Sequence, residues 1–138
     1  IMGLISLPGG AYYAASKHAL EGYFRALRFE LNEFNIKVSM VEPMGFKTNI
    51  VSNSKVAENK ISDYDAYRTR LEDYTKDLFS KSEEPTAVVE MLLKLVKNEN
   101  PKFNHPVGKG STLFPAIQYF SFKTFENSVI KNINKFKK

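Results

Sequence analysis

Hydrophobic residues recur at intervals of three and four positions in the first part of this chain, a spacing that predicts an amphipathic helix. A Pro-Gly-Gly turn at residues 8–10 precedes this helix, which we expect to cover residues 11–34. Its apolar stripe consists of Leu20, Phe24, Leu27, Leu31 and Phe34. Continuing the stripe backward with the same intervals reaches Lys17 and then Tyr13. The sequence therefore places a lysine on the helix face that we expect to be buried.

The same periodicity predicts three more helices. One covers about residues 64–80 and can be capped by Ser62 or Asp63, and the next follows an N-cap at Ser82 with Pro85 in its first turn. The last begins near residue 113 and continues as a single helix toward the C-terminus. Their apolar positions are Tyr64, Tyr67, Leu71, Tyr74 and Leu78, then Val88, Leu92, Leu95 and Val96, and finally Phe122, Phe125, Val129, Ile133 and Phe136.

Two short apolar segments between the helices have the character of strands. The segment VSMVEP, residues 38–43, ends at a proline, and residues 102–107 form an extended piece that closes at a Gly108/Gly110 turn. A helix, a tight turn and then a buried strand is the crossover pattern of proteins with parallel sheets. The pattern therefore predicts an α/β fold.

Composition narrows the class of protein. The chain has no Cys, which excludes disulfides and cysteine metal sites, and no apolar run reaches the length of a membrane span. Five Lys and one Glu after residue 114 account for +4 of the net charge of +5, which leaves +1 for residues 1–114. No basic surface for nucleic acid is predicted, and His18 and His105 lack partners at metal-ligand spacing. We expect a soluble, cytoplasmic protein without a metal site.

The candidate chemistry begins with Lys17, because an unpaired ammonium on a buried face is costly. Tyr13 lies one turn earlier on the same face and is an available neighbour. The cation favours the phenolate and lowers the tyrosine pKa from about 10 toward the working pH, where the hydroxyl can donate or accept a proton. Tyr119 and Lys123 repeat the spacing, but they lie in an amphipathic tail that no strand follows.

The residues around Tyr13 and Lys17 resemble the short-chain dehydrogenase/reductase family, including its hydroxysteroid and retinol dehydrogenase-like members. The similar segments are YAASKHALEGYFRALRFEL at residues 13–31 and VEPMGFKT at residues 41–48, with weaker similarity in SEEPTAVVEMLLKLV and HPVG. The resemblance implies an α/β doubly wound, Rossmann-like parallel sheet. It also implies an oxidoreductase that transfers a hydride between NAD or NADP and a hydrophobic secondary alcohol or ketone.

The resemblance also implies residue roles. Tyr13 would be the catalytic acid/base, and Lys17 would bind the nicotinamide ribose and lower the tyrosine pKa. The other expected cofactor contacts are Pro43, Gly45, Phe46 and Thr48. Met44 stands where the family usually has a Gly directly after the Pro, so we expect it to crowd the nicotinamide or narrow the pocket.

Two family features have no counterpart in the sequence, namely the Gly-rich phosphate loop and the serine expected upstream of Ile1. We therefore expect residues 1–138 to be the C-terminal part of one NAD(P)-binding domain of about 250 to 280 residues. In the family the segment after the Pro/Thr turn covers the substrate, so Tyr64 and Tyr67 are candidate substrate contacts. Alone, this chain would be an incomplete enzyme.

Partners and rival functions complete the expectations. Small residues at Ser16, Ala19 and Ala26 would permit a homodimer through the 11–34 helix, as is usual in the family. The basic, aromatic tail after residue 113 either packs on its own domain or a partner subunit, or lies on an anionic membrane surface. The rivals to an enzyme are a non-catalytic binding or scaffold protein that keeps this half-fold and a peripheral membrane protein.

Overall fold

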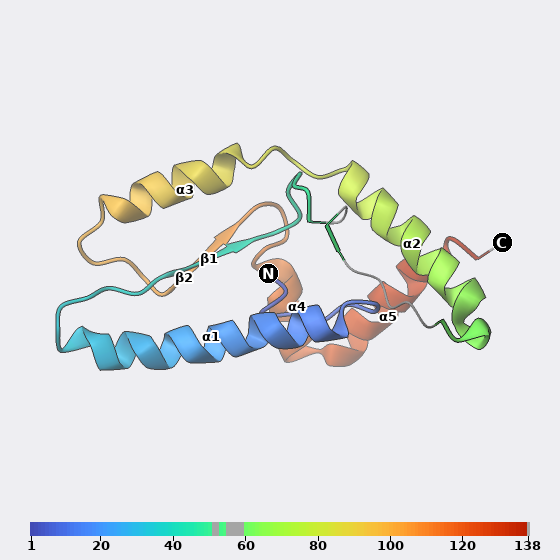
Figure 1. The fold of residues 1–138 in the computed structure, drawn as a ribbon, viewed down its shortest axis with the longest axis horizontal. Coiled ribbons are helices and arrows are strands. Elements are labelled where there is room, and N and C mark those ends of the chain that lie inside the picture. The colour runs from blue at the N-terminus through green and yellow to red at the C-terminus, as the bar shows by residue number, and fades with distance from the viewer. Residues whose placement is uncertain (51–52, 55–59, 138) are drawn as a thin grey trace.

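The computed structural model describes residues 1–50, 53–54 and 60–137 of the chain. In order, the elements are α1 (Ala11–Asn32), β1 (Met40–Pro43), the short 3-10 helix η1 (Ser62–Tyr64), α2 (Asp65–Ser80), α3 (Thr86–Val96), β2 (Asn104–Val107), α4 (Leu113–Phe120) and α5 (Phe122–Asn134). Figure 1 shows the two strands between α1 and α3, with α2, α4 and α5 gathered toward one end of the molecule.

The strands form a two-stranded parallel sheet in which Met40 pairs with Asn104 and Pro43 with Val107. The intervening α3 packs against both strands, which makes β1, α3 and β2 one parallel crossover unit. This arrangement confirms the α/β prediction and agrees with part of a Rossmann-like fold. Both predicted strands are present, although β1 begins at Met40 rather than Val38.

Helix α1 ends two residues before the predicted Phe34. Asn35 adopts a left-handed conformation with φ of 56°, and the Ile36 N–H donates to the Leu31 carbonyl at 3.2 Å. The Asn35 N–H donates to the Asn32 carbonyl at 3.1 Å, which completes a Schellman motif. Asparagine tolerates this conformation, so the chain turns sharply here toward β1.

The apolar stripe of α1 is less buried than its periodicity predicted. Leu20 and Phe34 are exposed, while Phe24, Leu27, Leu31 and Lys17 are half-buried. The buried residues of α1 are Ala14 and Glu21. Lys17 is therefore on the inward side of the helix, but it is not enclosed by the residues that the structure describes.

Several predicted helix boundaries were wrong. Ser82 does not cap α3, which begins at Thr86 after Pro85, because the preceding residues pair with the segment after β1: Glu83 bridges Phe46, and the Lys47 N–H donates to the Glu83 carbonyl at 2.9 Å. Neither Ser62 nor Asp63 makes a side-chain cap, since a 3-10 turn leads into α2.

The predicted C-terminal helix is broken into two at Ser121, whose φ of −151° and ψ of 78° are not helical. Tyr119 and Lys123 consequently belong to different helices. Within α5, Phe125 and Ile133 are buried and Val129 is half-buried, whereas Phe122 at the break is exposed. The Phe136 ring meets Tyr74 of α2 edge-on at 6.4 Å, so this stripe packs on its own domain. Among the described residues, no helix is long and apolar enough to cross a membrane.

Arg28 ties α1 to the residues that precede both strands. Its guanidinium donates to the Val38 carbonyl and, at 2.9 Å, to the Pro101 carbonyl, and it lies 5.9 Å from the centre of the Phe103 ring. The guanidinium donates to the two carbonyls from two separate nitrogens, whereas a lysine ammonium is a point charge on a single nitrogen. Arg28 therefore fixes the helix against the start of the sheet.

We expect Arg28→Lys to lower the free energy of unfolding by about 1–3 kcal/mol, because at least one carbonyl loses a charged donor. Denaturant unfolding followed by circular dichroism measures this change. Lys94→Ala, which removes an exposed cation from α3, is the control and should change stability by less than about 0.5 kcal/mol. Equal effects of the two substitutions would contradict the anchoring role of Arg28.

Candidate active site

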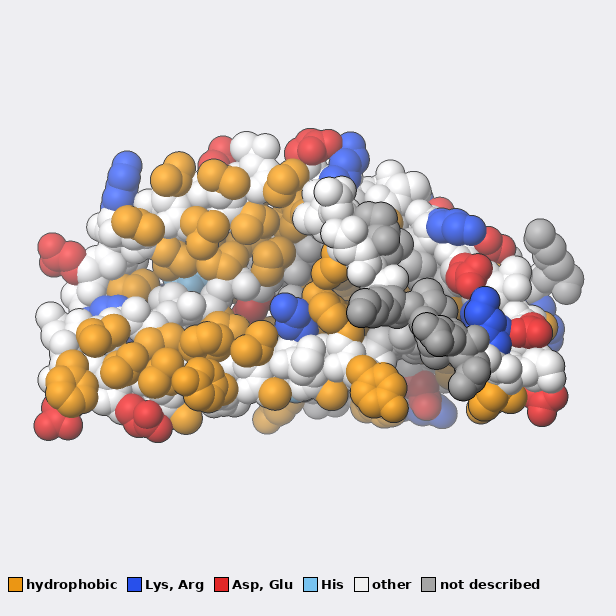
Figure 2. All heavy atoms as spheres, viewed as in Figure 1, with side chains coloured by type: hydrophobic (Ala, Val, Ile, Leu, Met, Phe, Trp, Pro, Cys, Tyr) orange, Lys and Arg blue, Asp and Glu red, His pale blue; other side chains and the backbone are white. Residues whose placement is uncertain are grey.

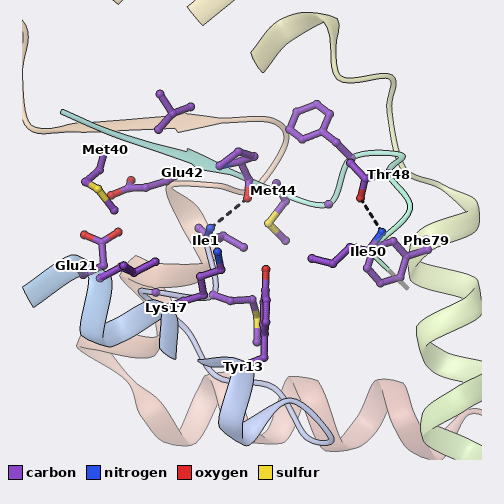
Figure 3. A pocket seen from close by; sticks show the side chains of 17 residues that line it. Ile1, Tyr13, Lys17, Glu21, Met40, Glu42, Met44, Thr48, Ile50 and Phe79 are labelled. Atoms are coloured by element: carbon purple, nitrogen blue, oxygen red, sulfur yellow. Dashed lines mark hydrogen bonds between the residues drawn. The ribbon is translucent and has the colours of Figure 1, made fainter. Parts of the chain in front are cut away.

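A cavity of about 370 Å³ lies between α1 and the segment that follows β1. Tyr13 and Lys17 line it from α1, Pro43 lines it from the end of β1, and Met44, Gly45, Phe46 and Thr48 line it from the chain after that strand. Figure 3 shows Tyr13 and Lys17 on one side of this space and Met44 and Thr48 on the other. The structure thus brings together in one cavity every residue that the sequence assigned to catalysis or to the cofactor.

Tyr13 and Lys17 meet as neighbours one helical turn apart. The Lys17 ammonium lies 5.4 Å from the centre of the Tyr13 ring, within the range of a cation–π contact. Tyr13 is 41% exposed and Lys17 is half-buried. Within the described part of the chain, the Lys17 ammonium has no hydrogen-bond or ion-pair partner. Its donors are therefore free to bind a ligand in the cavity.

The segment after β1 is held by backbone contacts to two other parts of the chain. The Met44 N–H donates to the Val107 carbonyl at 2.8 Å, and the Phe46 side chain is buried. Lys47 adds an exposed ion pair to Glu84 at 2.7 Å. The Thr48 hydroxyl oxygen accepts the Ile50 N–H at 3.4 Å, which leaves its own proton available for donation.

Two carboxyls at the far end of the cavity were missed in the sequence analysis. Glu42 of β1 is 3% exposed and accepts from the Asn104 side-chain amide, and Glu21 of α1 is 8% exposed. Among the described residues, Glu21 Oε2 has no hydrogen-bond partner. The Ile1 nitrogen donates to the Pro43 carbonyl at 3.1 Å. Glu21 continues the Tyr13–Lys17 spacing by one turn, a signal that could have identified it.

Comparison with known proteins agrees with this geometry. The sequence model of the short-chain dehydrogenases matches residues 1–59. YusZ, an uncharacterized oxidoreductase of Bacillus subtilis, is 33% identical over 141 aligned residues, which cover 96% of this chain and 50% of YusZ. The chain belongs to the short-chain dehydrogenase family.

Other members of this family are similar over shorter regions. A 3-ketodihydrosphingosine reductase of Bacteroides thetaiotaomicron is 33% identical over 78% of this chain and 41% of its own length. Retinol dehydrogenase 7 of Rattus norvegicus is 43% identical over 42% of this chain and 18% of its own length. The chain spans about half the length of YusZ and less of the other two relatives.

The two predicted substrate contacts of this short-chain dehydrogenase do not lie in the cavity. Tyr64 and Tyr67 line a separate, open groove of about 800 Å³ near Pro8, Gly9 and Leu71. They do not line the space around Tyr13, so a substrate contact there stays a prediction. His18 and His105 contact the carbonyls of Ala14 and Lys102, at 2.8 and 2.9 Å. The described residues contain no metal-binding group of His, Asp and Glu side chains.

Burial raises the pKa of the Glu21 carboxyl above its usual 4.5, and the charge of Glu42 raises it further, while Arg25 and His18 lower it. The folded state therefore holds this proton more tightly than the unfolded chain does. It follows that the contribution of Glu21 to stability falls as the pH rises from 4.5 through the folded-state pKa.

We expect Glu21→Gln to remove this loss, so that the variant gains stability over the native protein above that window and not below it. Urea unfolding across the pH range tests the prediction. Glu30→Gln, on the exposed side of α1, serves as the matched control. A pH dependence that is the same in the native protein and in both variants would show that Glu21 is not responsible.

Proposed function

We propose that this chain is the catalytic part of an NAD(P)-dependent oxidoreductase that interconverts a secondary alcohol and a ketone. The observation that carries the proposal is the shared cavity, in which Tyr13 and Lys17 face the Pro43–Thr48 segment. Its volume of about 370 Å³ lies within the range of small-molecule sites. The names of the relatives, an oxidoreductase, a reductase and a dehydrogenase, support this reaction class.

The residues around the cavity suit a nicotinamide cofactor. The Lys17 ammonium has no hydrogen-bond or ion-pair partner among the described residues, and Thr48 has a hydroxyl proton to donate. Both groups can bind ribose or amide groups. Pro43, Met44 and Ile50 supply apolar surface beside them. When bound, the nicotinamide would supply or accept the hydride. Whether the cofactor is NAD or NADP depends on contacts outside this cavity.

In the proposed reaction Tyr13 transfers a proton to or from the substrate oxygen. Its hydroxyl points into the cavity, where it would donate to the oxygen of a ketone or accept the proton of an alcohol. Lys17 would stabilise negative charge on the Tyr13 oxygen and bind the ribose with its remaining donors. Oriented acid/base groups of this kind commonly contribute about a hundredfold to ten thousandfold in rate.

We propose that the complete domain includes further strands beside this sheet. Each strand has a single strand neighbour within the described residues, so each retains an edge without a strand partner. Figure 2 shows hydrophobic side chains in two bands on one face, over α1 and over α3 with the strands. Leu20, Tyr23, Leu92 and Leu93 are among the exposed apolar residues of these helices. Additional strands would pair with the open edges of β1 and β2 and bury the two hydrophobic bands.

The family-type homodimer stays a proposal as well. Ser16, Ala19 and Ala26 of α1 are all exposed, so the small side chains that would permit close helix packing are accessible in this chain.

Replacing Tyr13 tests the proposed reaction. We expect Tyr13→Phe, in the protein as its source makes it, to lower turnover about a hundredfold or more with little change in cofactor affinity, because only the acid/base is lost. Tyr12→Phe removes the hydroxyl of the adjacent tyrosine, which is 94% exposed, and should leave turnover unchanged. Unchanged turnover in Tyr13→Phe would reject the assignment. A native protein that binds no NAD(P)H would favour the scaffold alternative.

A second candidate function is contact with an anionic membrane surface. At the break between α4 and α5, Tyr119 and Phe120 are 84% and 82% exposed, and Phe122 beside them is also exposed. Lys123 is the next residue, and its exposed ammonium lies 3.3 Å from Glu126. Exposed aromatic rings beside lysines suit the interface of an anionic bilayer.

Membrane contact predicts sedimentation with phosphatidylserine vesicles that weakens as salt is added. Phe120→Ser should reduce this binding severalfold, whereas Phe29→Ser, which changes an exposed phenylalanine of α1, should not. Binding that is absent, or that both variants reduce equally, would reject this candidate.

A further inference from the structure

A second cavity of about 340 Å³ lies beside the one that contains Tyr13. The two cavities share residues of three segments, including Met2, Met44, Phe46 and Phe79. The second one adds apolar side chains that the first lacks, namely Ile5, Leu7 and Leu78. The cavity that contains Tyr13 therefore shares walls with a neighbouring, mainly apolar chamber.

Met44 forms part of the wall between the two spaces. Gly108 behind it has φ of 99°, and a Cβ there would lie 3.1 Å from the Met44 Cβ and 3.2 Å from the Phe46 ring. Because Gly108 has no side chain, Met44 packs closely against its backbone and extends away from it. In Figure 3 the Met44 side chain and the Tyr13 hydroxyl project into the same cavity. A methionine side chain is unbranched and flexible, so it can yield to a narrow ligand and obstruct a wide one.

The charges at the second cavity argue against a charged occupant. Lys81 is paired with Asp77 at 2.7 Å, and Lys109 with Glu83 at 3.3 Å. These ammonium groups are also well exposed, which leaves the apolar residues to form the interior. A neutral hydrocarbon chain is the ligand that gains most from such a lining.

We propose that the second cavity holds the apolar chain of the substrate and that Met44 selects straight, unbranched chains over bulky ones. The inference rests on the proposed function, because the substrate oxygen must lie at Tyr13 while the chain passes Met44. It assigns the substrate to the class of long-chain secondary alcohols or ketones. Ile5, Leu7, Leu78 and Phe79 become the residues that contact the chain.

Leu78→Trp tests the chamber by filling it. In the protein as its source makes it, catalytic efficiency with straight-chain methyl ketones should rise about threefold to fourfold for each added methylene until the chamber is full. In Leu78→Trp this rise should stop at shorter chains. Leu113→Trp, on α4 and 58% exposed against 42% for Leu78, is the control and should keep the native dependence.

Direct binding provides a readout independent of turnover. Calorimetric titration with a long-chain methyl ketone, with oxidised cofactor present, should show tenfold or more weaker binding to Leu78→Trp, about the loss expected when a pocket excludes one or two methylenes. Tyr13→Phe should retain most of this affinity. Met44→Gly should increase the efficiency with a branched or cyclic ketone about tenfold relative to a straight one.

The outcomes separate this inference from the proposed function. The chamber would be contradicted, and the reaction left intact, if the native enzyme reduced ketones at rates that do not depend on chain length. The same conclusion would follow if Leu78→Trp left the chain-length dependence unaltered. A native protein that binds the long ketone in the chamber and turns over no ketone or alcohol overturns the reaction instead. Equal effects of Leu78→Trp and Leu113→Trp would also contradict the proposed chamber.

Discussion

The parallel register of β1 and β2, with Pro43 opposite Val107, decides where the pocket forms. Parallel strands end at the same edge of a sheet, so the turn after β1 and the turn after β2 must meet there. The Met44 N–H prolongs the pairing by donating to the Val107 carbonyl, and Gly108 then admits the Met44 and Phe46 side chains at close range. A side chain at position 108 would be strained at its φ of 99° and would displace both neighbours. The register and this glycine together aim Met44 at the space above Tyr13.

Helix α1 provides the opposite wall, and its position depends on an anchor at its far end. Arg28 links the helix to the residues that lead into each strand, about four turns along from Tyr13. A rigid helix fixed at that end carries Tyr13 and Lys17 to the edge where the strands finish. The cavity therefore has one wall set by the spacing of side chains along a helix and another set by strand register.

The sequence predicted what depends on local periodicity. The turn at residues 8–10 and the spacing along α1 placed Tyr13 and Lys17 on one face, and the family resemblance added Thr48; all three line one cavity. It did not predict features decided by distant contacts. Ser82 is a good capping residue, yet pairing between Phe46 and Glu83 kept the chain extended until Pro85. Ser121 interrupts a stripe that is periodic on both sides of it, and no residue type there signals the break. The second cavity could not be predicted from the sequence either, because its walls come from four separate segments.

Glu21 and Glu42 are two more features of the site that the sequence analysis did not predict. Apolar side chains at these buried positions would stabilise the fold, whereas burial and the neighbouring Glu42 charge raise the pKa of Glu21. Both carboxyls line one end of the cavity that also contains Lys17, and a pattern of apolar positions does not reveal them. The stripe of α1 places Tyr13, Lys17 and Glu21 in three successive helical turns. Polar residues at positions where apolar ones would stabilise the fold are themselves a signal of a functional site.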